Sequence, residues 1–176
     1  MVNYCRNRLP GGTYFFTVTL RDRWSRPLVQ HIDLLREAFR VVREQRSFDV
    51  DAIVILPDHL HAVWTLPEGD ADYPGRWRAI KSRFSRPLLE QGVKLQRTAR
   101  GDYALWQRCY WEHTIRGDDD RQRHVDYSHN NPVKHRLVRQ VMDWPFSSFH
   151  RFVREGLLSP DWAGRAMANV QGEFGE

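Results

Sequence analysis

The chain has 176 residues, which suffices for one globular domain with its own hydrophobic core. Its apolar runs are too short to span a bilayer and its two cysteines lie far apart, which excludes membrane-spanning proteins and disulfide scaffolds. The net charge of +5, from 27 Lys and Arg against 22 Asp and Glu, favours a polyanionic partner. We expect one cytoplasmic domain over residues 1–160, followed by a polar C-terminal tail over residues 161–176.

The first half of the chain alternates between strand and helix patterns. β-branched and aromatic residues crowd between positions 13 and 20 and predict a first strand. From about 30 to 46, apolar residues recur at helical spacing, which predicts an amphipathic helix. Residues 48–56 and 59–66 predict a hairpin of two further strands around a Pro57-Asp58 turn.

The second half adds a helix, a strand and a helix. The second helix is predicted over 75–89, the fourth strand over 110–116, and the last helix from 118 to about Asn131, where Pro132 discourages its continuation. The order is therefore strand, helix, strand, strand, helix, strand, helix. This order predicts an α+β fold: a ferredoxin-like antiparallel sheet with helices packed on one face.

Two histidines, His59 and His61, are separated by one residue in the third predicted strand. Because side chains alternate between the faces of a strand, both imidazoles lie on one face, about 7 Å apart along the strand. They can share one divalent metal ion, and a hard ion such as Mg²⁺ needs added oxygen ligands. The intervening and following Leu60, Ala62 and Trp64 predict that the opposite face is buried. The alternative is a pair of hydrogen-bonded structural histidines.

A second group of polar residues lies in the last predicted helix. Tyr127 and Asn131 are four residues apart, so the phenol and the amide stack on one helix face. The amide oxygen can complete a metal site, and the phenol can act as a nucleophile if a cation, metal or base helps to remove its proton. Lys134 and His135 follow at the helix exit. The alternative is a tyrosine that packs on the sheet, with Asn131 only closing the helix.

The segment between residues 76 and 108 is strongly basic, with nine Lys and Arg against two acidic residues. Cations that flank the apolar stripe of the second predicted helix can neutralise the phosphates of a nucleic acid. They are Arg76, Arg78, Lys81, Arg83 and Arg86. The alternative is a solvated helix face without a ligand.

Four segments and a closing tripeptide resemble the REP-associated tyrosine transposases, bacterial relatives of the single-tyrosine HUH transposases. They are GTYFFTVT (12–19), ILPDHLH (55–61), WEHTIR (111–116) and DYSHNNPVKH (126–135), closed by DWP (143–145). The resemblance covers most of the chain. One departure is Arg136, which stands where the family commonly has glycine and predicts a different turn beyond the last helix.

The resemblance implies a catalytic site. His59 and His61, with Asn131 as the third ligand, are expected to hold Mg²⁺ or Mn²⁺. Tyr127 is expected to attack a phosphate of single-stranded DNA, which gives a 5′-phosphotyrosine and a free 3′-OH.

The resemblance also implies a partner and a setting. The partner is single-stranded DNA whose palindromic repeat folds as a REP-type hairpin. Tyr4 and Arg6 near the N-terminus, and Lys134 and His135 at the exit of the last helix, join the basic helix as candidate DNA contacts by their position. A nucleoid-associated monomer is expected, with a dimer as the alternative.

Two other functions fit part of the pattern. A non-catalytic nucleic-acid-binding module explains the fold and the basic helix but has no use for Tyr127, His59 and His61 together. A metal-dependent hydrolase with water as nucleophile explains the histidines and makes the tyrosine incidental. Only the tyrosine mechanism leaves a covalent protein–DNA product.

Overall fold

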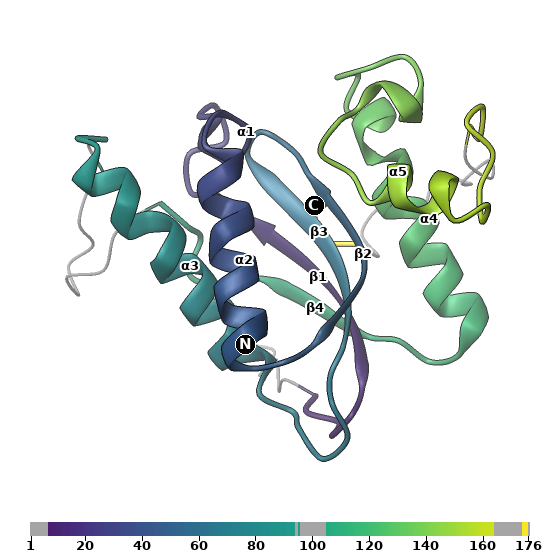
Figure 1. Cartoon of the computed structure of the whole chain (residues 1–176), viewed down its shortest axis with the longest axis horizontal. Coiled ribbons are helices and arrows are strands. Elements are labelled where there is room, and N and C mark those ends of the chain that lie inside the picture. The colour runs from purple at the N-terminus through teal and green to yellow at the C-terminus, as the bar shows by residue number, and fades with distance from the viewer. Residues whose placement is uncertain (1–6, 94, 96–104, 164–173, 176) are drawn as a thin grey trace, which may run out of the picture.

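The computed structural model describes residues 7–93, 95, 105–163 and 174–175. Its centre is a four-stranded sheet built from β1 (Thr13–Thr19), β2 (Asp49–Ile55), β3 (His59–Thr65) and β4 (Trp111–Thr114). The strand order is β2-β3-β1-β4 and all neighbouring strands are antiparallel (Figure 1). This order places the two strands of the β2–β3 hairpin side by side, as predicted, and leaves β2 and β4 at the edges.

The helices follow the predicted order, with three short additions. They are α1 (Pro27–Gln30), α2 (Ile32–Gln45), α3 (Tyr73–Glu90), α4 (Asp118–Lys134), the 3-10 helix η1 (Val141–Asp143) and α5 (Phe149–Arg154). α1, η1 and α5 were not predicted, because none is long enough to develop an apolar period. None of the described helices combines the length and the apolarity that crossing a bilayer requires.

One face of the sheet is covered by α2 and α3 and carries the larger core. Trp64 from β3 stacks on Trp77 from α3, with ring centroids 4.1 Å apart and planes 18° apart. Phe16 of β1 and Phe39 of α2 each contact both of these rings edge-on. All four side chains are buried, so this face holds α2 and α3 by aromatic packing.

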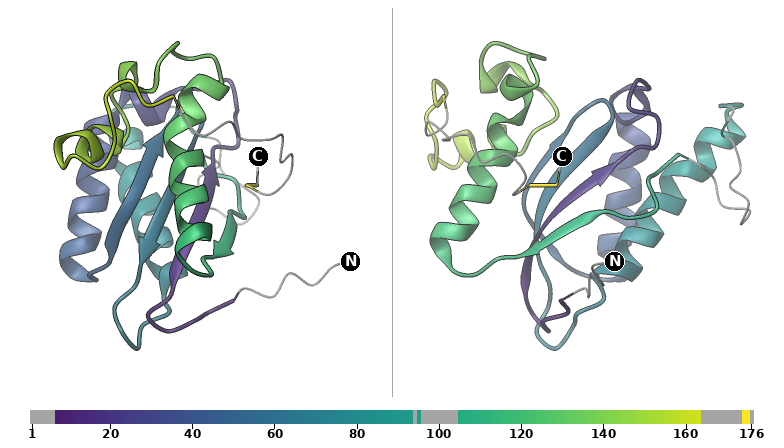
Figure 2. Two further views of the ribbon diagram at one scale, coloured as in Figure 1. Left: turned by 90° about the vertical axis from the view of Figure 1, so that its right-hand side faces the viewer. Right: turned by 180° about the vertical axis from the view of Figure 1, so that it is seen from behind.

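The opposite face of the sheet is covered by α4, as the two views in Figure 2 show. A smaller cluster joins Phe15 and Val63 of the sheet to Val125 and Tyr127 of α4. The predicted α+β ferredoxin-like sheet is thus confirmed, with α2 and α3 on one face as expected. The last helix adds a layer on the other face.

α4 continues beyond the residue at which the sequence pattern ended it. Pro132 lies inside the helix, which ends at Lys134, so the predicted stop at Asn131 is wrong. Pro132 is tolerated because it lies in the last turn, and a hydrogen-bonded cap closes that turn: Arg136 N donates to Val133 O and Leu137 N to Pro132 O. Arg136 adopts φ 57°, the left-handed backbone that usually favours glycine at this position.

The aromatic turn around Trp144 covers the exposed edge of β2. Ile55 N donates to Phe146 O, and Ser148 N donates to Ile53 O, as a further strand would. The Trp144 indole N–H donates to Ile55 O at 3.0 Å. These bonds satisfy backbone groups that an open edge strand would present to solvent.

Candidate active site

His59 and His61 open β3 and face α4. Their ring centroids lie 5.0 Å apart, and both side chains are buried. Leu60, Ala62 and Trp64, between and beyond them, pack into the core under α2 and α3. The alternation expected of a strand therefore places the imidazole pair on the smaller, α4-covered face.

Both imidazoles are oriented through their Nδ1 atoms. His59 Nδ1 lies 2.8 Å from Asp58 Oδ1, and a carboxylate only accepts. His61 Nδ1 lies 2.9 Å from the Thr17 hydroxyl, which donates its own proton to Phe174 O at 2.5 Å. The partners therefore assign the proton to Nδ1 in both rings, which leaves the Nε2 lone pair of each as a ligand atom.

Asp58 connects the imidazole pair to a neighbouring loop. Its carboxylate also pairs with Arg23 Nε at 2.5 Å. Burial raises the pKa of Asp58, but the hydrogen bond from His59 and the positive charge of Arg23 outweigh it and lower the pKa below its usual value. The carboxylate thus stays ionised and holds His59 by a charge-assisted bond.

α4 presents three polar side chains to the histidines at intervals of four residues. The Tyr127 ring lies 5.2 Å from that of His61, and the His135 ring lies 5.1 Å from that of His59. Asn131 is four residues from each, so it lies between them on the same helix face, and its side chain is fully buried. The structure therefore brings together the predicted residues His59, His61, Tyr127 and Asn131.

The phenol of Tyr127 is held between a cation and an aromatic ring. Lys134 Nζ donates to the Tyr127 hydroxyl at 2.9 Å and lies 4.8 Å from its ring centroid. The Phe174 ring stacks on that of Tyr127, with centroids 3.7 Å apart and planes 9° apart. An ammonium group at the oxygen favours the phenolate, which is the nucleophilic form.

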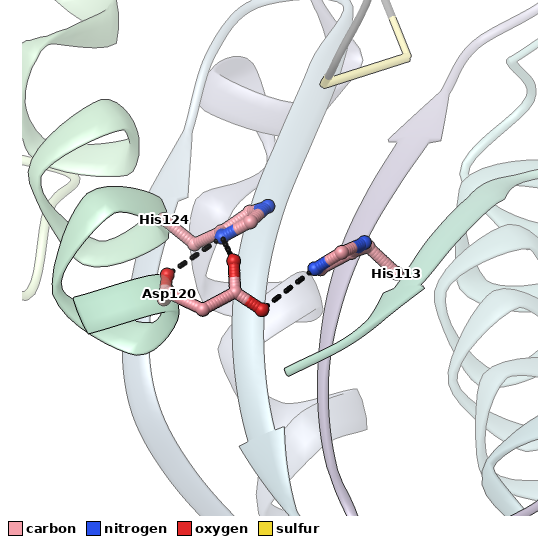
Figure 3. A group of neighbouring side chains, drawn as sticks. All are labelled: His113, Asp120 and His124. Atoms are coloured by element: carbon pink, nitrogen blue, oxygen red, sulfur yellow. Dashed lines mark hydrogen bonds and ion pairs between the residues drawn. The ribbon is translucent and has the colours of Figure 1, made fainter. Parts of the chain in front are cut away.

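A second polar cluster lies one turn earlier on α4 and includes β4 (Figure 3). His113 Nε2 lies 2.8 Å from Asp120 Oδ2, which also accepts from Arg116 N. His124 Nδ1 lies 2.8 Å from the backbone oxygen of Asp120. Burial lowers the pKa of His124, which keeps its ring neutral. The ligand atoms of His113, Asp120 and His124 lie within 4.8 Å of one another, a spacing that suits a metal ion.

The two histidine clusters differ in how ready they are for a metal. The His124 nitrogen that faces its cluster donates to a carbonyl, so it carries a proton and has no lone pair to offer. The His113 nitrogen and the Asp120 carboxylate likewise bond to each other. In contrast, the Nδ1 partners of His59 and His61 place the lone pair of each ring on Nε2, and Asn131 contributes an amide oxygen. The donor set of His59, His61 and Asn131 therefore fits Mg²⁺ or Mn²⁺ better.

The structure argues against one predicted DNA contact, Arg76. This side chain is only 2% exposed, and its guanidinium pairs with Asp70 at 2.7 Å and donates to Ser47 O at 2.8 Å. It joins the loop before α3 to the chain after α2. The helical wheel placed Arg76 on the flank of the apolar stripe, but partners from distant segments could not be read from that pattern.

The other cations of α3 lie where DNA can reach them. Arg78, Arg83 and Arg86 are exposed, and Lys81 donates to Gln107 O at 3.3 Å. Gln107 N in turn donates to Thr19 O, and Thr19 pairs with His59 across the β1–β3 ladder. Lys81 therefore stands at the same end of the sheet as the imidazole pair, on the side covered by α3.

The remaining predicted DNA contacts divide into two groups. Lys134 and His135 are exposed at the end of α4 and also touch the site through Tyr127 and His59. Tyr4 and Arg6 lie outside the described residues.

Sequence reasoning assigned no role to Asp58, Thr17 or Phe174. Asp58 directly precedes His59, so a carboxylate next to a candidate ligand was an available signal. Thr17 and Phe174 offered none, because their contacts join residues that are 44 and 157 positions apart in the chain.

Comparison with known proteins finds relatives that cover almost the whole chain. No protein-family model matches the chain. It is 48% identical over 164 residues to a REP-associated tyrosine transposase of Escherichia coli K12, across 93% of this chain and 92% of the relative. A Haemophilus influenzae relative assigned to the same family is 40% identical over 176 residues, across 99% of this chain and 100% of the relative. The solved structure of a REP-associated tyrosine transposase bound to a REP hairpin superposes with a TM-score of 0.86 at 45% identity, across 100% of this chain and 98% of that one.

Proposed function

The chain belongs to the REP-associated tyrosine transposases, and from this premise we propose that it nicks and rejoins single-stranded DNA at REP-type hairpins through a 5′-phosphotyrosine on Tyr127. Its relatives are enzymes that act on DNA, and one of them is bound to a REP hairpin. The observation that carries the proposal is the position of the Tyr127 hydroxyl, 2.9 Å from Lys134 Nζ and beside the imidazole pair.

The proposed reaction exchanges one phosphate ester for another. The Tyr127 phenol loses its proton and its oxygen attacks phosphorus. The bond from phosphorus to the 3′ oxygen breaks, and that oxygen takes up one proton to give the free 3′-OH, so no proton is gained or lost overall. Lys134 is placed to stabilise the phenolate before the attack. Since the phosphotyrosine keeps the energy of the diester bond, a 3′-OH can reverse the step and rejoin the strand without ATP.

A divalent ion belongs to the proposal. His59, His61 and Asn131 would hold Mg²⁺ or Mn²⁺, and the bound ion would polarise the phosphoryl oxygens and orient the phosphate. Asp58 and Thr17 fix the two imidazole rings with Nε2 as the ligand atom. The protein thus presents the imidazole donors in one protonation state and one orientation.

DNA binding is proposed for the cations of α3 and for those at the end of α4. Arg78, Lys81, Arg83 and Arg86 would bind phosphates along α3, and Lys134 and His135 would do so at the site. Tyr4 and Arg6 remain candidate contacts by position. We propose that the chain acts as a monomer, built from a domain over 1–160 and a tail over 161–176.

The test is the formation of a denaturant-resistant adduct between the protein and a labelled hairpin oligonucleotide with single-stranded flanks. With Mn²⁺ we expect an adduct that EDTA abolishes and that Tyr127→Phe lacks. His59→Ala combined with His61→Ala is expected to abolish the adduct, whereas His113→Asn, at the second cluster, is expected to retain it.

Other outcomes point elsewhere. Tight binding without any adduct, across several flanking sequences, would support a non-catalytic binding module. Metal-dependent cleavage that survives Tyr127→Phe would support hydrolysis by water. Loss of the adduct in His113→Asn, with the fold intact, would move the metal to the second cluster.

A further inference from the structure

We propose that Trp24, on the loop between β1 and α1, is a stacking platform for an unpaired base of the DNA strand that enters the active site. The inference rests on the proposed function, since it names a contact for the same substrate. It concerns a residue to which neither the sequence pattern nor the comparisons assign a role.

Trp24 is unusual because its large ring faces solvent. It is 93% exposed, more than any other described large hydrophobic residue. Its backbone N–H donates to Asp22 Oδ1 at 3.0 Å, and the Ser25 hydroxyl donates to Asp22 O at 2.8 Å. The loop is thus folded on itself, while the indole makes no part of the core. A ring with two open faces is what a base needs for stacking.

The loop is joined to the candidate metal ligand His59 through Asp58. Leu20 N donates to Asp58 O at 2.8 Å, and Arg23 Nε pairs with the Asp58 carboxylate at 2.5 Å. The same carboxylate holds His59. Arg23 and His59 therefore share Asp58 as a partner, and Trp24 directly follows Arg23 in the chain. A DNA strand bound at His59 passes within reach of this loop.

The charge around Trp24 favours a polyanion over an apolar protein partner. Arg21, Arg23 and Arg26 are exposed on both sides of it, and Asp22 is the only acidic residue among positions 21–26. Cations that alternate with an aromatic ring bind single strands by neutralising phosphates while the ring stacks on a base. A base in a duplex is already stacked on its neighbours, so the occupant is an unpaired base of a flank.

The test compares two labelled DNA hairpins that differ only in a single-stranded flank. Trp24→Ala is expected to weaken binding of the flanked hairpin about tenfold or more, by fluorescence anisotropy, and to leave binding of the flank-free hairpin unchanged. Trp24→Phe keeps a stacking ring and is expected to stay within about threefold of the wild type. Leu157→Ala removes another exposed apolar side chain, 63% exposed, and is the matched control without an effect.

A second probe reports the contact itself. With 2-aminopurine placed at successive flank positions, the wild type is expected to quench its fluorescence at one position, and Trp24→Ala to lose that quenching. The proposal is overturned if Trp24→Ala binds the flanked hairpin as tightly as the wild type, or weakens both hairpins equally. Adduct formation is followed in parallel. If the adduct forms but binding of the flanked hairpin does not depend on Trp24, only this inference is overturned. If binding of the flank depends on Trp24 but no adduct forms, only the proposed tyrosine mechanism is overturned.

Discussion

The two faces of the sheet are built from the same strands but present different kinds of side chain. Towards α2 and α3, β1 and β3 present Phe16, Ala62 and Trp64, and the contacts are aromatic. Towards α4, the alternate positions present Thr17 and His61 together with Phe15, so hydrogen bonds are combined with ring contacts. One face therefore contributes mainly stability, and the other holds buried polar groups in fixed orientations.

This difference affects how much each face contributes to the stability of the fold. Buried polar side chains gain little on folding unless each is bonded, so the α4 face depends on particular partners such as Asp58 for His59 and Thr17 for His61. The apolar face depends mainly on shape and volume. Substitutions on the two faces should accordingly fail in different ways.

The largest effect is expected on the apolar face. Trp64→Ala removes a fully buried ring that stacks on Trp77, and should lower the free energy of unfolding by about 3–5 kcal/mol. Urea denaturation followed by circular dichroism measures it. Trp64→Phe, which refills part of the volume, should lose clearly less. A loss below about 1 kcal/mol in the alanine variant would mean that this aromatic cluster is not the main source of stability.

On the polar face, Asp58 should affect metal binding more than folding. Asp58→Asn keeps the side-chain shape but removes the charge that holds His59 and pairs with Arg23. We expect the affinity for Mn²⁺ to fall about 10- to 100-fold, measured by titration calorimetry without DNA. Asp33→Asn, an exposed carboxylate on α2, is the control and should bind Mn²⁺ as the wild type does. Equal affinities in all three proteins would show that Asp58 does not position the ligand.

The contrast between the faces also explains what could be predicted from the sequence. Strand alternation in β3 placed His59 and His61 opposite Trp64, and spacing in α4 placed Tyr127 and Asn131 on one face, because both periods are local. Local pattern could not place α4 across the second face of the sheet, since that depends on which strands it meets. The tertiary partners of Arg76 could not be predicted either, because they lie in other segments of the chain.

The pH dependence of stability tests another buried polar group of α4, His129, on the side of the helix that packs against Phe149 and Phe152. Burial and the charge of Arg151 lower the pKa of His129 to about 3. The unfolded chain, with a pKa of about 6.5, therefore binds a proton that the folded protein does not, so this stability is present above pH 6.5 and is lost as the pH falls towards 3. Between pH 7.5 and 5, we expect His129 to account for a loss of about 2 kcal/mol in urea denaturation.

His129→Gln is the matched variant, because glutamine can still bond to Ser148 but does not titrate. Its stability should change less between the two pH values, by about the same 2 kcal/mol. His124, whose pKa burial also lowers, adds a loss of the same sign that remains in both proteins. Parallel pH profiles for the wild type and His129→Gln would show that His129 is not protonated on unfolding in this range.

The smallest effect is expected where the polar face ends, at the cap of α4. Arg136 is exposed and holds φ 57°, so its side chain adds backbone strain without a compensating buried contact. Arg136→Gly should raise the free energy of unfolding by roughly 0.5–1 kcal/mol, because glycine adopts this conformation freely. Arg139→Gly, at an exposed position without positive φ, should lower it instead, because there glycine only adds freedom to the unfolded chain. If both glycine variants destabilise equally, the left-handed turn is not strained, and the departure from glycine at this position has no cost in stability.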